Sequence, residues 1–200
     1  MKVTIAILSL ATVLSLAFPS YAMEGQVLEE GTNKPIEGAL VVAIWKGSQV
    51  RPAHSSTICY HMKTTTTDVH GKYRILDFSG NLNPFIADRQ ASIESIYKSG
   101  YHGSKQVPSA IGVDLLAPHA GTQEQQFEQI GARVPYECGL TDEGKKSLLP
   151  LMRLIYEEMK SNAKTSKQLE EVEGMLSSIE SVEFGLEVAY QRQKDRQKKK

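Results

Sequence analysis

The sequence contains only two cysteines among its 200 residues, and it has no excess of either charge, since Lys+Arg and Asp+Glu are balanced at 23 each. Two cysteines exclude a disulfide-rich scaffold and a four-cysteine zinc site. A balanced chain has no overall field that would attract nucleic acid, so we predict no nucleic-acid partner. A hydrophobic content of 40% is typical of a globular protein and not of a disordered one.

A long hydrophobic run without charges occurs once, at residues 3–18, directly after the positive charge of Lys2. Ser20 and Ala22 follow, with small side chains at the two positions that a signal peptidase reads. We therefore predict a signal peptide over residues 1–22 and a periplasmic or secreted protein with no transmembrane segment after cleavage. The alternative is an uncleaved anchor, but a run of about 16 residues is shorter than the ~20 that span a bilayer.

Export changes the expected chemistry of Cys59 and Cys138. An oxidising compartment and an even number of cysteines favour a disulfide between them. In the chain-entropy model, a bridge that closes so long a loop stabilises the fold by at most about 4.5 kcal/mol. The alternative is a catalytic thiolate at Cys59 next to His61, which lies two residues later and on the same face of a strand.

Short β-rich runs punctuated by turns extend from residue 23 to about residue 116. Tyr73 and Ile75 alternate with polar residues, whereas the run that ends at Trp45 is almost continuously apolar, as in a buried strand. This pattern predicts a small antiparallel β-sandwich with Val41, Trp45, Tyr73 and Ile75 in its core. The expected strands cover residues 26–28, 39–45, 60–67, 72–75, 91–97 and 111–116.

Several turn and strand residues in this region form a recognisable pattern. They are Gly25-Gln26-Val27, Thr32 to Pro35-Ile36, Gly38-Ala39, Val41, Trp45, Cys59-Tyr60-His61, Thr67-Asp68, Gly71, Tyr73, Ile75 and Tyr97-Lys98-Ser99-Gly100-Tyr101. The pattern resembles the carboxypeptidase regulatory-like domain of exported bacterial proteins over residues 23–102. The resemblance implies a transthyretin-like, prealbumin-type β-sandwich over residues 23–116. It says little about function, because many exported proteins reuse this module.

Enzyme motifs associated with related folds are absent from the sequence. None of the five histidines has a glutamate three residues later, which excludes the ligand pair of a zinc carboxypeptidase. The chain ends in three lysines, unlike hydroxyisourate hydrolases, and no two histidines are two residues apart, as intradiol dioxygenases require. We therefore predict a protein that is not an enzyme and that has no cofactor and no metal site. A hydrolase or metal-dependent enzyme centred on His61 is the alternative.

Helical periodicity replaces the β pattern after a connecting segment at residues 117–140, where a short helix is expected near residues 124–130. The hydroxyl of Thr141 and the acids that follow it predict a helix start. Pro150 is expected to interrupt or restart this helix. We predict an α-helical hairpin with a basic tail over residues 141–200. Its two apolar stripes are Leu151, Leu154, Ile155, Tyr156 and Met159, followed by Leu169, Val172, Leu176, Ile179, Val182 and Leu186.

The hairpin and one loop are the candidate binding surfaces. The apolar helix faces can bury against each other, against the sandwich or in a partner. We predict that the protein is a non-enzymatic exported envelope protein that binds a protein or an envelope polymer. The candidate partner-binding residues are His61, Leu176 and Ile179, together with the long loop expected at residues 47–58. An immunity or inhibitor protein against a toxin delivered to the periplasm is a further alternative.

The C-terminal tail is basic from Arg192 to Lys200, with Asp195 as its one acidic residue. Such a tail can make weak contacts with anionic lipid headgroups or with an acidic partner. An ordinary soluble helix end is the favoured interpretation, because cations are stabilised at the negative end of the helix dipole.

Overall fold

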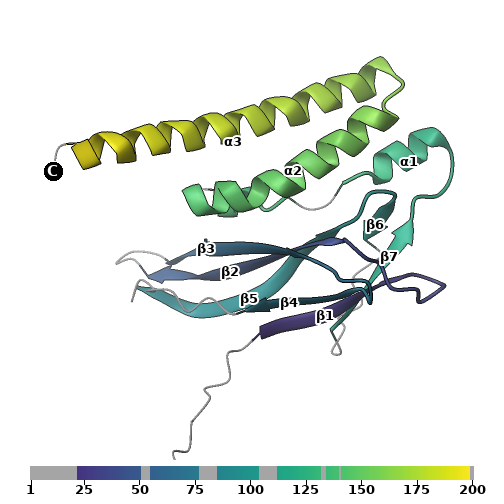
Figure 1. Ribbon diagram of the computed structural model, residues 1–200, viewed down its shortest axis with the longest axis horizontal. Helices are drawn as coiled ribbons and strands as arrows, with labels where there is room; N and C mark the ends of the chain where they lie inside the picture. Colours follow the sequence, from purple (N-terminus) through teal and green to yellow (C-terminus); the bar gives the residue numbers. More distant parts are fainter. Residues whose placement is uncertain are drawn as a thin grey trace, which may run out of the picture.

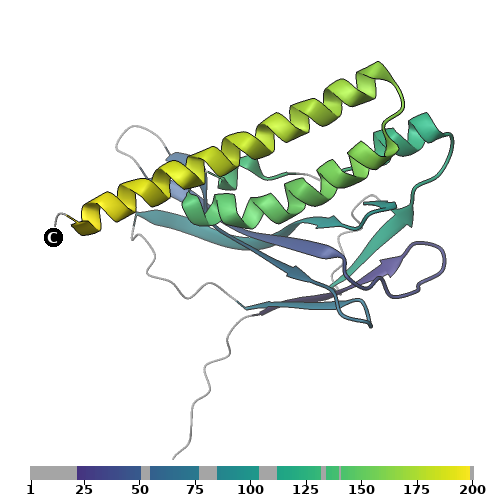
Figure 2. The same ribbon diagram turned by 45° about the horizontal axis from the view of Figure 1, so that its top comes forward.

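The structure is a computed structural model that describes residues 22–50, 55–76, 85–103, 112–131, 134–139 and 141–198. Two β-sheets pack face to face, and helices cover the outer face of one of them (Figures 1 and 2). The predicted α+β class, with a β-sandwich followed by a helical hairpin, is confirmed. The predicted signal peptide lies outside the described residues except for Ala22.

The two sheets have four and three strands. The four-stranded sheet contains, in spatial order, β4 (Lys72–Leu76), β1 (Ala22–Glu29), β7 (Val113–Pro118) and β6 (Tyr101–Gly103). The three-stranded sheet contains β3 (Ser55–Thr66), β2 (Leu40–Val50) and β5 (Ile86–Tyr97) in that order. The strands pair antiparallel as predicted except for β1 and β7, which run parallel. Between these two strands the chain also forms strands of the other sheet. A crossover connection of this kind allows two strands of one sheet to run in the same direction.

Two other sequence predictions about the strands are wrong. The loop expected at residues 47–58 is largely a β-hairpin, because Gly47–Val50 pairs with Ser55–Ile58, and the remaining residues 51–54 lie outside the described part. The segment is polar and Ser-rich and lacks the alternation of apolar residues that indicates a strand. The two strands nevertheless continue to pair through their backbones. Strand β6 was not predicted, since three residues are too few to show a period.

Strand β2 lies in the middle of its sheet, and both of its faces are buried. Alternate residues of a strand point to opposite faces. One set packs with Met62 and the helices, and this set contains Leu40, Val42 and Ile44. The other set packs against the four-stranded sheet, and it contains Val41, Ala43 and Trp45. The continuous apolar run in the sequence therefore reflects a strand buried between two layers.

The turn between β3 and β4 has the chemistry that the sequence indicates. The Asp68 carboxylate accepts the backbone N–H of Lys72 at 2.8 Å and that of His70 at 2.9 Å. These two hydrogen bonds lower the pKa of Asp68. Gly71 has φ of +70°, and a Cβ there would overlap the carbonyl oxygen of Val27. A side chain at position 71 would therefore both strain the turn and push it away from the backbone of β1.

The remaining elements are helical. In chain order they are α1 (Gln123–Gln129), the 3₁₀ helix η1 (Tyr136–Cys138), α2 (Asp142–Asn162) and α3 (Ser166–Lys198). Helices α2 and α3 run antiparallel along the outer face of the three-stranded sheet (Figure 1). None of the described helices combines the length and apolar character needed to cross a membrane.

Helix α2 continues through Pro150, which corrects the expectation of an interruption at this residue. A proline inside a helix costs roughly 3 kcal/mol, because one hydrogen bond is lost and the ring crowds the preceding turn. Leu148, Leu151 and Met152 are almost fully buried on either side of it. Each such side chain contributes about 1.5–3 kcal/mol on burial, so packing against the sheet outweighs the local cost.

Trp45→Ala should lower the free energy of unfolding by about 3–5 kcal/mol, because the indole is 3% exposed and its removal leaves a cavity between the sheets. Val69→Ala, at a side chain that is 63% exposed in the β3–β4 turn, is the control and should change stability by less than about 0.5 kcal/mol. Urea denaturation measures both. Equal midpoints for Trp45→Ala and wild type would contradict the two-sheet core.

Candidate functional site

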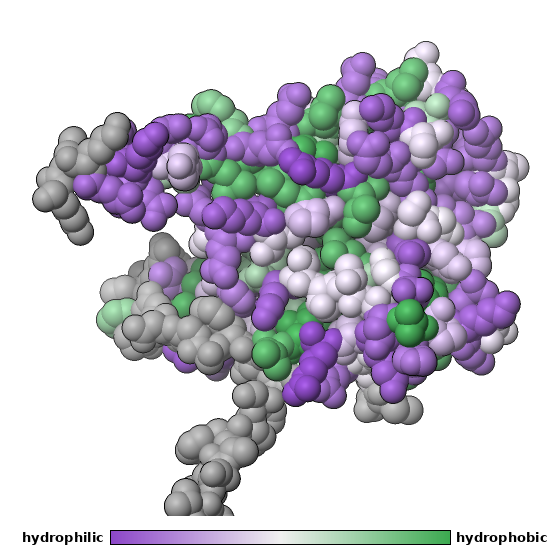
Figure 3. Space-filling model, in the orientation of Figure 1, coloured by the Kyte–Doolittle hydropathy of each residue, from purple (hydrophilic) through white to green (hydrophobic). Residues whose placement is uncertain are grey.

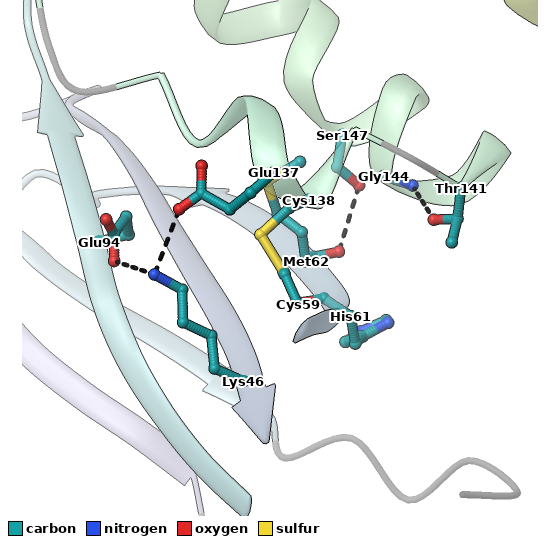
Figure 4. Close-up of a disulfide and its surroundings, with 10 residues drawn as sticks. All are labelled: Lys46, Cys59, His61, Met62, Glu94, Glu137, Cys138, Thr141, Gly144 and Ser147. Atoms are coloured by element: carbon teal, nitrogen blue, oxygen red, sulfur yellow. Dashed lines mark hydrogen bonds and ion pairs between the residues drawn. A yellow bond between two sulfur atoms is a disulfide. The ribbon is translucent and has the colours of Figure 1, made fainter. Parts of the chain in front are cut away.

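The predicted disulfide joins the sheet to the helices. Cys59 in β3 and Cys138 in η1 are bonded, with their Cα atoms 5.0 Å apart across a separation of 79 residues. Figure 4 shows that the bridge lies at the N-terminal end of α2. The same pairing rules out a free catalytic thiolate at Cys59 in this structure. The bond therefore fixes the start of the helical layer to the edge strand of the three-stranded sheet.

Polar contacts surround the disulfide and hold the same junction (Figure 4). The ammonium of Lys46 lies 3.2 Å from the Glu137 carboxylate and 3.7 Å from that of Glu94. The hydroxyl of Ser147 donates to the carbonyl of Met62 at 3.3 Å. One ion-pair cluster and one hydrogen bond thus connect η1 and α2 to the strands beside the covalent bridge.

The first turn of α2 is fitted closely against η1. The Thr141 hydroxyl accepts the N–H of Gly144 at 3.0 Å, which confirms the predicted helix cap. A Cβ at position 144 would overlap the carbonyl oxygen of Cys138. Glycine is therefore required here for close packing, and its helical conformation is ordinary.

The side chain of His61 is largely buried at this junction. Its ring lies edge-on to Trp45 with centroids 4.8 Å apart, and its Nδ1 is 3.4 Å from the Glu143 carboxylate. The His61 side chain is 8% exposed, whereas that of Glu143 is 68% exposed. Burial lowers the pKa of His61, Glu143 partly opposes this, and Lys63 adds to it. This placement favours a packing role for His61 over contact with a partner.

A second polar site, which the sequence analysis missed, holds the far end of α2. The buried Glu158 carboxylate accepts a short hydrogen bond from the Tyr97 hydroxyl and one of 2.6 Å from the N–H of Gly100. The Tyr97 oxygen also lies 3.1 Å from the carbonyl of Leu154. Burial, then the hydrogen bond to Glu158, raises the pKa of Tyr97, so its phenol remains a proton donor.

Two histidines lie beside Glu158. The Nδ1 of His119 is 3.7 Å from its carboxylate, which is an ion-pair distance when the imidazole is protonated. The rings of His119 and His102 stack with centroids 5.9 Å apart. One sequence signal could have revealed this site, because Glu158 is seven residues after Leu151 and three after Ile155, on the apolar stripe of α2. Among the described residues, no three His, Cys, Asp or Glu side chains are placed to hold a metal ion.

Helix α3 leaves large apolar side chains exposed. We call them the outer apolar face of α3; they are Leu169 (51% exposed), Leu176 (37%), Phe184 (72%) and Tyr190 (60%). Figure 3 shows apolar side chains interrupting the hydrophilic surface along α3. The spacing of these residues places them within about one third of the helix circumference.

Ile179, one of the predicted partner-binding residues, does not belong to this face. It is 5% exposed and packs in the core with α2, and Met175 and Val182 of α3 lie partly buried next to it. The prediction that Ile179 is available to a partner is therefore wrong. Periodicity identified one apolar stripe, but only part of that stripe fits against α2. Leu176, one turn earlier and rotated outward, remains exposed.

Comparison with known proteins found no matching family model, no matching curated protein and no matching solved structure.

Replacing both cysteines (Cys59→Ala/Cys138→Ala) should destabilise the protein by about 2–5 kcal/mol and loosen the start of α2. Mass spectrometry of the protein purified without reducing agent should find no free thiol. Hydrogen exchange should then show faster exchange near residues 141–148 in the variant than in wild type, while β1 and β4 change less. Two free thiols in the non-reduced protein would contradict the disulfide.

The buried His61 should make stability depend on pH. Its pKa is depressed on folding, so the unfolded chain takes up the proton first as the pH falls below about 6.5. The stability that depends on neutral His61 is therefore fully present above that value, and it decreases as the pH falls toward the folded-state pKa of His61. Urea midpoints measured between about pH 5 and 8 should fall less steeply in His61→Gln than in wild type. Parallel curves for the two proteins would contradict this assignment.

Proposed function

We propose that this protein is a non-enzymatic envelope protein, periplasmic or secreted, that binds a protein partner through the outer apolar face of α3. The observation that supports this most directly is the exposure of four large apolar side chains on one face of a single helix. Single exposed apolar residues are ordinary, but several large ones on one face of a helix form a surface that can bind another protein.

The composition of the face favours a protein over an envelope polysaccharide. Phe184 and Tyr190 provide large, stiff side chains of the kind that dominate the binding energy of protein interfaces. A polar polymer would leave its own hydroxyl groups without hydrogen-bond partners against Leu169 and Leu176. An apolar or amphipathic protein surface would not incur this cost.

Two features support export. The N-terminal residues 1–22 have the sequence of a signal peptide. The Cys59–Cys138 bridge lies at a structurally central junction, and disulfides of this kind persist in oxidising compartments. Both features fit a protein that works in the periplasm or outside the cell.

The two-sheet sandwich supports a scaffold role for residues 23–116. Its seven strands and its glycine-containing turns are compatible with the carboxypeptidase regulatory-like module that the sequence resembles. In this proposal the sandwich positions the helical layer and has no chemistry of its own. His61 contributes packing next to Trp45, and Glu158 fastens α2, so neither is assigned a catalytic role.

Phe184→Asp should abolish capture of the partner from envelope extract by the full mature chain, because it places a charge in the middle of the apolar face. Val69→Asp is the matched control, since Val69 is similarly exposed but lies in the β3–β4 turn. Circular dichroism should show both variants folded. The proposal requires one identified protein that wild type and Val69→Asp retain and Phe184→Asp loses; equal capture by all three would contradict it.

A further inference from the structure

Charged residues accompany the outer apolar face of α3 in a defined order. Glu173, Glu180, Glu187 and Lys194 follow one another at intervals of seven residues, and all four are exposed. Seven residues are close to two helical turns, so these side chains form one row. The row runs through the outer apolar face, because its positions fall between those of Tyr190 and Phe184 around the helix. The surface thus carries apolar side chains at intervals along its length, acidic side chains along most of it and a basic side chain at its end.

The basic end of α3 projects from the body of the protein. The side chain of Lys145, in the first turn of α2, lies over Gly185 of α3. Residues after about Tyr190 therefore extend past the start of α2, as Figures 1 and 2 both show. Arg192, Lys194 and Arg196 in this projecting end are exposed. They can reach a second molecule without rearrangement of the fold.

We propose that a second copy of this chain covers the outer apolar face, with the two α3 helices packed antiparallel about a two-fold axis at Phe184. This inference rests on the proposed function, since it names the partner of the same surface. A two-fold axis requires a surface that is complementary to itself. An antiparallel arrangement meets this requirement, because it sets the basic end of each helix against the acidic part of the other.

The positions along the helix define the register. With Phe184 at the axis, the residue n positions after Phe184 in one copy lies opposite the residue n positions before Phe184 in the other. Lys194 of one copy then lies beside Glu173 of the other, and Tyr190 lies within one turn of Leu176. Each of these contacts occurs twice. Phe184, the most exposed aromatic side chain of this face, occupies the centre, where solvent is excluded most completely.

The same register limits the strength of the dimer. Glu180 of one copy comes near Glu187 of the other, and this like-charge contact opposes association. The pairing of Glu183 with Arg153 of α2 neutralises one neighbouring carboxylate. We therefore expect a dimer that dissociates on dilution.

An anionic membrane fits this surface less well than a second copy does. The basic end alone would be attracted to anionic headgroups, whereas Glu173, Glu180 and Glu187 on the same face would be repelled. A membrane therefore leaves most of the apolar face uncovered, and a second copy covers it along its length.

Sedimentation equilibrium of the full mature chain tests the dimer directly. Wild type and the control Val69→Asp should show a concentration-dependent monomer–dimer equilibrium. Phe184→Asp should raise the dissociation constant by about a hundredfold or more, because it buries two charges at the axis. Its far-ultraviolet circular dichroism should match that of wild type, since Phe184 is 72% exposed in the single chain.

Charge reversal tests the direction and register of the pairing. Glu173→Lys alone and Lys194→Glu alone should each weaken the dimer by about tenfold, because each creates two like-charge contacts. A mixture of these two variants should recover dimerisation, since every Glu173–Lys194 contact in the mixed dimer is again between opposite charges. In a parallel pairing, position 173 would meet 173 and position 194 would meet 194, where wild type already has like charges. Each single variant would then exchange one like-charge contact for another and would not weaken the dimer, so the loss in the single variants excludes a parallel pairing.

Cysteine crosslinking provides an independent measurement of the axis. Phe184→Cys should form a covalent dimer under mild oxidation, because position 184 meets itself across the axis. Leu169→Cys should not, because position 169 is 15 residues from the axis and the two copies of it lie about 45 Å apart along the paired helices. Efficient crosslinking through Leu169→Cys and not through Phe184→Cys would overturn the proposed register.

The inference and the proposed function can fail separately. A wild type that stays monomeric at all accessible concentrations overturns the dimer, and the proposed function stands if Phe184→Asp still abolishes capture of an identified envelope protein. A monomer that instead binds phosphatidylglycerol vesicles, with loss on Lys194→Glu, overturns the dimer in favour of a membrane surface. A dimer that captures no other protein supports the inference and restricts the partner to a second copy.

Discussion

The segment from Leu40 to Trp45 places alternate side chains on opposite faces of β2, and all six of these residues are buried. One face forms the core between the two sheets, and the other forms the core beneath the helices. Both layers therefore depend on the same short strand. The sheets could not pack without it, and α2 would have no apolar surface to cover. The position of every other element, including the exposed helix α3, follows from this double burial.

Two fastenings hold α2 on that surface, one at each end. The Cys59–Cys138 bridge fixes the start of the helix, and the Glu158 carboxylate fixes the end through Tyr97 and Gly100. Because both fastenings act on α2, they leave α3 to pack mainly on its neighbour. This explains how a helix of 33 residues can retain an apolar face in contact with solvent.

The wrong predictions from the sequence share one physical cause. The hairpin that includes Gly47, the continuous helix through Pro150 and the buried Ile179 were all misjudged from local pattern. In each case a tertiary contact outweighs a local preference. Backbone pairing extends a polar strand, burial of neighbouring leucines carries a helix past a proline, and contact with α2 selects which part of an apolar stripe is covered.

The sequence by itself determined the α+β class, the helix start at Thr141 and the core positions of Trp45 and Tyr73, and it restricted the cysteine pairing to one possibility. These follow from periodicity, capping chemistry and the number of cysteines, which are local or countable properties. Only the tertiary structure decided that β1 and β7 run parallel, that Glu158 closes the end of α2, and that Leu176 is exposed while Ile179 is buried. These features depend on which surfaces pack together. The sequence pattern shows which residues of a helix are apolar, but it does not show which other surface covers them.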